Sequence, residues 1–279
     1  MRIDRNAVRG EADGATSQAL SKVPELAVAF WIAKVLATTL GETGGDALSM
    51  TLHLGYGVST LIFLGFFVVT LAVQLRTSHY HPAAYWAVVV ATTTVGTTTS
   101  DYMDRTLGLG YMKSSAALLA LVLVILAVWH RVTGRVAVDY VTNRVDETFY
   151  WVTILVSNTL GTALGDYTAD NLGLGFQRGA LVFAALLAVV AVLYYGRRIP
   201  ESVAFWAAYV LTRPLGATVG DTLTKAPADG GLGLGRVWSS LTLLAAMIAI
   251  VAAARSLRAR PTRNGGESAS WRDTADAPS

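Results

Sequence analysis

A motif that ends in aspartate occurs four times in this chain. The copies are TTLGETGGD (38–46), TTVGTTTSD (93–101), NTLGTALGD (158–166) and RPLGATVGD (213–221). A tryptophan stands fifteen residues before each aspartate, at Trp31, Trp86, Trp151 and Trp206. Chance does not hold Trp, Gly and Asp at fixed spacing four times, so the chain contains an internal repeat.

The repeat continues beyond each aspartate. Nine residues after the first three aspartates comes a glycine followed by an aromatic residue, whereas the fourth copy has LGLG at 232–235 after an insertion. Successive aspartates are 55, 65 and 55 residues apart. This alternation indicates that a unit of two repeats was itself duplicated.

Charge-poor stretches account for most of the chain. Hydrophobic residues make up 53% and charged residues 15%, against about 25% charged residues in a typical soluble domain. Eight stretches have the length that a helix needs to cross a bilayer: about 25–46, 56–75, 83–101, 114–132, 147–166, 179–196, 201–221 and 237–254. The sequence therefore predicts an all-α polytopic membrane protein with eight transmembrane helices, and it makes an ordinary soluble enzyme a poor hypothesis.

Two spans per repeat make four repeats that run the same way through the membrane. We expect an eight-helix transmembrane domain over residues 23–255, with repeats at about 25–76, 82–132, 146–197 and 201–254. When the eight spans are numbered in chain order, the even-numbered spans are apolar all round, whereas the odd-numbered spans are rich in Gly, Ser and Thr. The odd spans are therefore expected to form an inner core and the even spans an outer ring. The polar ends, 1–22 and 256–279, are expected to be flexible cytoplasmic tails.

Lys and Arg predict the orientation. If both termini lie on one side, that side carries fifteen of the loop and tail cations and the other side carries five, namely Arg105, Lys113, Arg178, Lys225 and Arg236. The positive-inside rule then places both termini in the cytoplasm. This distribution of basic residues also explains the net charge of +3 without a nucleic-acid partner.

The odd spans hold every charge that falls inside the predicted membrane: Lys34, Glu42, Asp46, Asp101, Asp166, Arg213 and Asp221. Ionisable groups in hydrocarbon are costly unless they face the bundle interior or water. Fifteen helical residues span roughly 22 Å, so the aspartates are expected in the outer third of the bilayer if the repeated tryptophans anchor its cytoplasmic interface.

Helical periodicity continues the polarity below each aspartate. Residues four, seven and eight positions earlier share the aspartate's face, which gives a predicted site lining of Glu42, Thr38, Thr39, Thr93, Thr94, Thr97, Asn158, Thr159 and Thr162. Glycines at four-residue spacing fill the neighbouring face and are expected to let helices approach closely. A local helix break at these glycines, most favoured beside Pro214, is the alternative.

Two cations qualify this picture. Lys34 and Arg213 offset two of the five buried negative charges and leave a formal excess of three. In a closed ring the fourth repeat adjoins the first, so Arg213 is expected to pair with Glu42 across that seam. Asp104, Asp170 and Asp229 lie at other offsets in the repeats and are interpreted as loop charges. The four histidines lie in loops or at span ends, out of register with one another, and are not expected to be ligands.

Carboxylate, hydroxyl and amide oxygens suit hard cations, and the chain has no cysteine. The sequence therefore predicts a transporter of a divalent ion such as Mn²⁺, carried as substrate and with no resident cofactor. Asp46, Asp101, Asp166 and Asp221 are the expected ligands, and Glu42 is an additional ligand or a proton carrier.

Three other functions stay open. The first is a channel for protons or monovalent cations, although the loops between paired spans are short for a pore helix and filter. The second is an intramembrane hydrolase with an aspartate dyad, which fourfold repetition disfavours. The third is a structural or signalling membrane protein with a fixed polar core.

The repeated LG-x3-GD unit, followed by LGLG and an aromatic residue, resembles a bacterial family of multi-pass proteins described only as uncharacterised membrane-anchored proteins. The resemblance covers about 25–254 and implies the topology and a bacterial source, but no activity. The first repeat departs from the pattern with Glu42 and with HLGYG, and the fourth departs with Arg213, Pro214 and its insertion.

Overall fold

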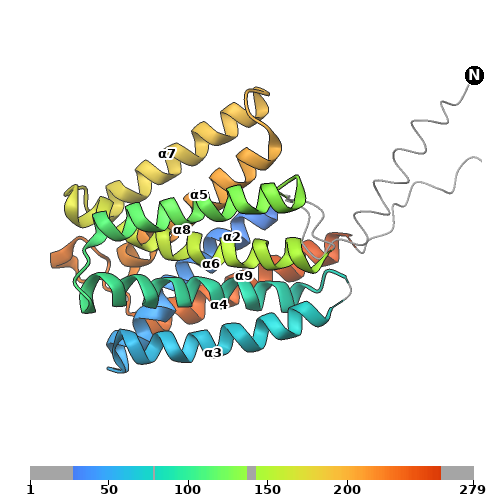
Figure 1. Ribbon diagram of the computed structural model, residues 1–279. Coiled ribbons are helices and arrows are strands. Elements are labelled where there is room, and N and C mark those ends of the chain that lie inside the picture. The colour runs from blue at the N-terminus through green and yellow to red at the C-terminus, as the bar shows by residue number, and fades with distance from the viewer. Residues whose placement is uncertain (1–27, 78, 137–142, 259–279) are drawn as a thin grey trace, which may run out of the picture.

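The computed structural model describes residues 28–77, 79–136 and 143–258, and these residues form helices and turns but no strand. The eight long helices are α2 (Val28–Asp46), α3 (Gly55–Arg76), α4 (Pro82–Asp101), α5 (Tyr111–Thr133), α6 (Arg144–Asp166), α7 (Gly175–Tyr195), α8 (Glu201–Thr224) and α9 (Arg236–Arg258) (Figure 1). The all-helical prediction is confirmed. The two predicted tails lie almost entirely outside the described residues.

Each of the first three aspartates ends its α-helix and is followed by a five-residue π-helical segment. These segments are η1 (Ala47–Thr51), η2 (Tyr102–Thr106) and η3 (Tyr167–Asn171). The fourth repeat instead extends α8 to Thr224 and then forms a short 3-10 turn, η4 (Pro227–Asp229). Single π-helical turns occur often at functional sites, and here they mark the same place three times.

The helices that end in the aspartate motif form a closed cycle of contacts. α2 packs on α4, α4 on α6, α6 on α8, and α8 returns to α2. These four helices also hold most of the buried side chains, whereas α3, α5 and α7 bury only two to five residues each. The polar helices are therefore covered by protein.

The apolar helices pack on the repeat that follows their own. α3 lies against α4, α5 against α6, α7 against α8, and α9 closes the series against α2 (Figure 1). The two long helices of one repeat make little contact with each other. Each repeat is thus completed by its neighbour, so one repeat by itself leaves its polar helix uncovered.

Among the described residues, four helices are long and apolar enough to cross a membrane: α3, α5, α7 and residues 236–256 of α9. Their mean hydropathy is 2.1–2.3, and 11–28% of each window is buried inside the protein. The apolar surface that remains suits contact with lipid chains. These four helices indicate a membrane protein. The helices α2, α4, α6 and α8 are long enough to cross a membrane, but they are too polar to be identified as spans by composition.

Glycines allow close helix approach around the whole cycle. The same glycine position is used in every repeat, five residues before the aspartate: Gly41, Gly96, Gly161 and Gly216. Each of these glycines contacts the next helix of the cycle, at the residue that stands eight positions before the aspartate of that helix. A methyl group on Gly96 would lie 2.9 Å from the backbone carbonyl carbon of Asn158. This confirms the expected close approach, and the alternative of a helix break beside Pro214 is wrong, since α8 stays helical through Pro214.

The LGLG turns require left-handed backbone. Gly108 and Gly110 have φ values of 69° and 78°, and the corresponding glycines of the third and fourth repeats are also positive. In the first repeat His53 occupies the first of these two positions, with φ at 56°. The HLGYG departure therefore keeps the turn and places a side chain in a conformation that favours glycine.

The expected role of the repeated tryptophans is wrong for three of them. Trp86, Trp151 and Trp206 are 2–6% exposed and pack with Phe30 in an aromatic cluster between the helices. For example, the Phe30 and Trp86 ring centroids are 5.7 Å apart, and the Trp206 ring lies 5.9 Å from that of Tyr150. These rings close the core at the end opposite to the aspartates instead of facing the membrane interface.

Candidate ion-binding site

The four repeated aspartates gather at one end of the helix cycle. Asp46, Asp101, Asp166 and Asp221 are each 2–3% exposed, and each lies at or within one turn of the end of its α-helix. Buried carboxylates need compensating partners. The structure supplies these partners from the loop side of the cycle and from its centre.

One cation joins the aspartates of the second and third repeats. Arg105 in η2 donates a hydrogen bond from Nε to Asp101 Oδ1 at 2.8 Å, and its Nη2 lies 3.6 Å from Asp166 Oδ2. Burial by itself lowers the pKa of Arg105, but the two carboxylates outweigh it and raise that pKa. Arg105 therefore stays charged and clamps two neighbouring helices.

A second cation joins the aspartates of the fourth and first repeats. Lys225 Nζ lies 3.3 Å from Asp221 Oδ1 and 3.6 Å from Asp46 Oδ2. Arg236, the first residue of α9, adds a contact of 3.4 Å from its Nε to Asp46 Oδ2. Burial lowers the pKa of Lys225, but Asp221 and Asp46 raise it above its usual value.

Glu42, Asp46 and Asp221 form one compact cluster. Each offers a carboxylate oxygen, and these oxygens all lie within 4.8 Å of one another. All three side chains are buried. Within the described parts of the chain this is the group of acidic side chains with spacing suited to a metal ion. The other two predicted ligands, Asp101 and Asp166, lie against Arg105 and outside this group.

Arg213 occupies the centre of the cycle below this cluster. Its Nη2 lies 2.9 Å from Glu42 Oε2 and donates hydrogen bonds to Thr97 Oγ1 and, at 2.6 Å, to Thr162 Oγ1. Glu42, Thr97 and Thr162 all stand four residues before their aspartates. The fourth repeat thus inserts a guanidinium among the equivalent positions of the other three, and the pair with Glu42 spans the expected seam.

The other predicted lining threonines are buried and donate to backbone carbonyls. Thr38 and Thr93 donate to backbone carbonyls of a neighbouring helix, at Thr212 and Ala37. The hydroxyl groups of Thr39, Thr94 and Thr159 bond to carbonyls of their own helices. In the described hydrogen bonds, only Thr97 and Thr162 of the predicted threonines reach the central charged groups.

Lys34 does not lie in an ion pair with any described carboxylate. Its side chain is fully buried, with Nζ 3.5 Å from Asn158 Oδ1 and 4.1 Å from the centroid of the Tyr209 ring. Asn158 also donates to Thr92 Oγ1 at 3.0 Å. The predicted charge-pairing role of Lys34 is replaced by an amide contact and a cation–π contact.

Sequence reasoning missed three cations at the site. Arg105, Lys225 and Arg236 were assigned to loops, yet with Lys34 and Arg213 they remove the formal excess of three negative charges. The signal was the four-residue spacing from Asp101 to Arg105 and from Asp221 to Lys225, which favours an ion pair wherever the helix continues. Asp104 is also no free loop charge: it accepts hydrogen bonds from Ser100 and Ser114.

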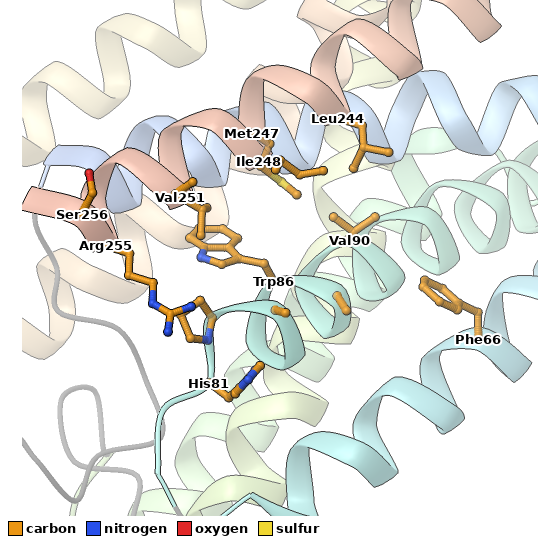
Figure 2. A pocket seen from close by; sticks show the side chains of 14 residues that line it. Phe66, His81, Trp86, Val90, Leu244, Met247, Ile248, Val251, Arg255 and Ser256 are labelled. Atoms are coloured by element: carbon orange, nitrogen blue, oxygen red, sulfur yellow. The ribbon is translucent and has the colours of Figure 1, made fainter. Parts of the chain in front are cut away.

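A separate groove of about 740 Å³ lies between α3, α4 and α9. Figure 2 shows its lining, with Trp86 and Val90 from α4 facing Met247, Ile248 and Val251 from α9. His81 and Arg255 lie at one end. None of the clustered carboxylates lines this groove, so it is distinct from the charged centre.

Comparison with known proteins gives one result. A family model described as a Repeat of Unknown Function (DUF347) matches the chain four times, over residues 29–80, 84–135, 149–199 and 204–259. The internal repeat is therefore confirmed. No curated protein and no solved structure matches the chain.

Proposed function

The chain belongs to the DUF347 repeat family, and from that premise we propose that its four repeats form a membrane transporter for a hard divalent cation such as Mn²⁺. In this proposal all eight helices cross the membrane, with α2, α4, α6 and α8 as an inner core. The bilayer is the cytoplasmic membrane of a bacterium, with both termini in the cytoplasm. The protein performs no chemistry on its substrate.

The observation that carries the proposal is the cluster of Glu42, Asp46 and Asp221. Two oxygens on opposite sides of a bound Mg²⁺, Mn²⁺ or Ca²⁺ lie about 4–5 Å apart, because each metal–oxygen bond is about 2.0–2.6 Å long. Carboxylate oxygens within 4.8 Å of one another fit that spacing. Oxygen ligands alone also favour these hard ions over softer metals.

The position of the cluster suits entry from the side opposite the predicted cytoplasmic face. Lys225 and Arg236, which lie over the carboxylates, are 15% and 23% exposed. At the other end of the core, the aromatic cluster around Phe30 and Trp206 closes the interior. The arrangement therefore fits a carrier in a state that is not fully open to either side of the membrane. Its ligands lie nearer the end of the core that faces away from the cytoplasm.

Arg213 favours a carrier over a channel. Its guanidinium lies at the centre of the helix cycle and contacts side chains from three other helices. A fixed positive charge on the axis repels a passing cation. A channel would need a route that avoids Arg213, whereas a carrier needs only a site that is exposed to each side in turn.

A non-transporting protein with a fixed polar core is the second candidate. It is favoured by the ion pairs that Glu42 and each of the four repeated aspartates make with an internal cation. Such a protein needs no ion, since the charges already balance. The two functions differ in one measurable property, which is ion movement.

Flux of Mn²⁺ into proteoliposomes tests the proposal. Wild-type protein is expected to move Mn²⁺, and Glu42→Gln, Asp46→Asn and Asp221→Asn are each expected to abolish the flux measured per amount of folded protein reconstituted. Asp170→Asn is the matched control, because Asp170 lies in η3 outside the cluster. Flux equal to that of wild type in all three cluster variants would contradict the assignment. Absence of flux in wild type would favour the protein with a fixed polar core.

A further inference from the structure

The two clamps over the aspartates are equivalent in the sequence. Arg105 follows Asp101 by four residues and reaches Asp166 of the next repeat. Lys225 follows Asp221 by four residues and reaches Asp46 of the next repeat around the cycle. The second and fourth repeats therefore carry matching clamps, as expected from the duplication of a two-repeat unit.

The two clamps hold their carboxylates differently. Arg105 makes a 2.8 Å hydrogen bond to Asp101, and a guanidinium offers several donors in a fixed plane. Lys225 has its closest contact at 3.3 Å, to Asp221 Oδ1. That oxygen is buried without a hydrogen-bond partner, as is Asp166 Oδ2 at the longer contact of Arg105. The ammonium is a compact charge on a flexible stem, so the Lys225 clamp is the looser one.

Only the looser clamp has a third carboxylate. Glu42 stands four residues before Asp46, and the equivalent residue before Asp166 is Thr162. The group with metal-like spacing therefore coincides with the lysine clamp, and the arginine clamp has two carboxylates. A divalent ion bound at the cluster would meet the ammonium of Lys225 at short range, where like charges repel strongly.

Hydrogen bonds on both sides of Lys225 hold its backbone in place. The Lys225 N–H donates to the Asp221 carbonyl at 2.9 Å, and its carbonyl accepts from Gly233 N–H at 2.9 Å. The side chain is 15% exposed, so part of it reaches the surface of the protein. Because the backbone is held, a release of the ammonium involves the side-chain torsions of Lys225.

We propose that Lys225 is a tethered cation that neutralises Asp46 and Asp221 when no ion is bound, and that an incoming divalent ion displaces its ammonium into solvent. Arg105 is the permanent counterpart that holds Asp101 and Asp166 together. Lys225 is thus a positioning residue that sets the affinity of the site by competing with the substrate. This inference rests on the proposed function.

Calorimetric titration of purified wild-type protein with Mn²⁺ tests this competition. Lys225→Met removes the internal competitor and is expected to lower the Kd for Mn²⁺ by about tenfold. Lys225→Arg strengthens the clamp and is expected to raise the Kd. Lys113→Met is the matched control, since Lys113 is exposed on α5, and it should leave the Kd unchanged.

Amine labelling of wild-type protein tests the displacement without a mutation. Added Mn²⁺ is expected to increase modification of Lys225, measured by mass spectrometry, while exposed Lys113 stays constant. Mn²⁺ binding with an unchanged or raised Kd in Lys225→Met, or with unchanged Lys225 labelling, would overturn the inference and leave the proposed function. Absence of Mn²⁺ binding in wild type and in both Lys225 variants would overturn both.

Discussion

Arg213 on α8 and Glu42 on α2 form a buried ion pair, with Nη2 2.9 Å from Oε2. The Arg213 side chain is fully buried, and that of Glu42 is 4% exposed. The residues lie 171 positions apart in the chain, in the last and the first repeat. Their contact joins the last repeat to the first and so helps to close the helix cycle.

Removal of Arg213 is expected to destabilise the protein strongly. Arg213→Ala leaves Glu42 as a buried carboxylate without its counter-ion, and loss of one partner of such a pair costs about 3–5 kcal/mol. Arg213→Ala combined with Glu42→Ala is expected to recover part of that loss. Chemical denaturation of the four proteins in detergent measures the coupling, and purely additive effects on the free energy of unfolding would contradict this pairing.

Much of the fold follows from periodicity and spacing. The recurrence of Trp, Gly and Asp predicted four repeats, and the apolar stretches predicted the helices. Spacing along one chain did not reveal that α3 packs on α4 instead of on α2. That choice depends on how the glycine faces of α2 and α4 bring these two helices together, which leaves the apolar helix to cover the next repeat.

The site was predicted in part. Its acidic residues were recognisable because carboxylates in an apolar span are rare. Arg105 and Lys225 were not recognised, because a cation just beyond a span is also what membrane orientation produces. The π-helical continuation after Asp101 brings Arg105 back over the carboxylate, and sequence alone did not predict that continuation.

Replacement of Gly96 by alanine is expected to destabilise the helix cycle. The added methyl group would lie 2.9 Å from backbone atoms of Asn158 and Thr159, so α4 and α6 must separate. Gly65→Ala on α3 is the control, because no atom lies within 4 Å of its added methyl group. There the better helix propensity of alanine should stabilise by about 0.5–1 kcal/mol. A higher thermal midpoint for Gly96→Ala would contradict the close packing.

The turn of the first repeat should be improved by glycine. His53 has φ at 56°, and left-handed backbone costs a residue with a side chain about 1–2 kcal/mol. His53→Gly is therefore expected to raise the free energy of unfolding, while Gly108→Ala in the second repeat is expected to lower it. Thermal unfolding in detergent compares the two. Loss of stability in His53→Gly would show that the imidazole makes a contact that outweighs the backbone cost.

Lys34 is expected to reduce stability. Its ammonium is fully buried and contacts an amide oxygen and an aromatic ring instead of a carboxylate. An isolated buried charge is costly, whereas methionine has a similar shape and no charge. Lys34→Met should raise the thermal midpoint in detergent. A lower midpoint would mean that the contacts with Asn158 and Tyr209 outweigh the cost of burying the charge.

Anomalous X-ray scattering from crystals of the protein grown with Mn²⁺ tests the central claim most directly. The account predicts one strong peak within bonding distance of carboxylate oxygens from Glu42, Asp46 and Asp221, with the ammonium of Lys225 turned away from it. Crystals of Asp221→Asn grown in the same way should lack the peak. A peak between Asp101 and Asp166, or no peak in the cluster at saturating Mn²⁺, would contradict the account.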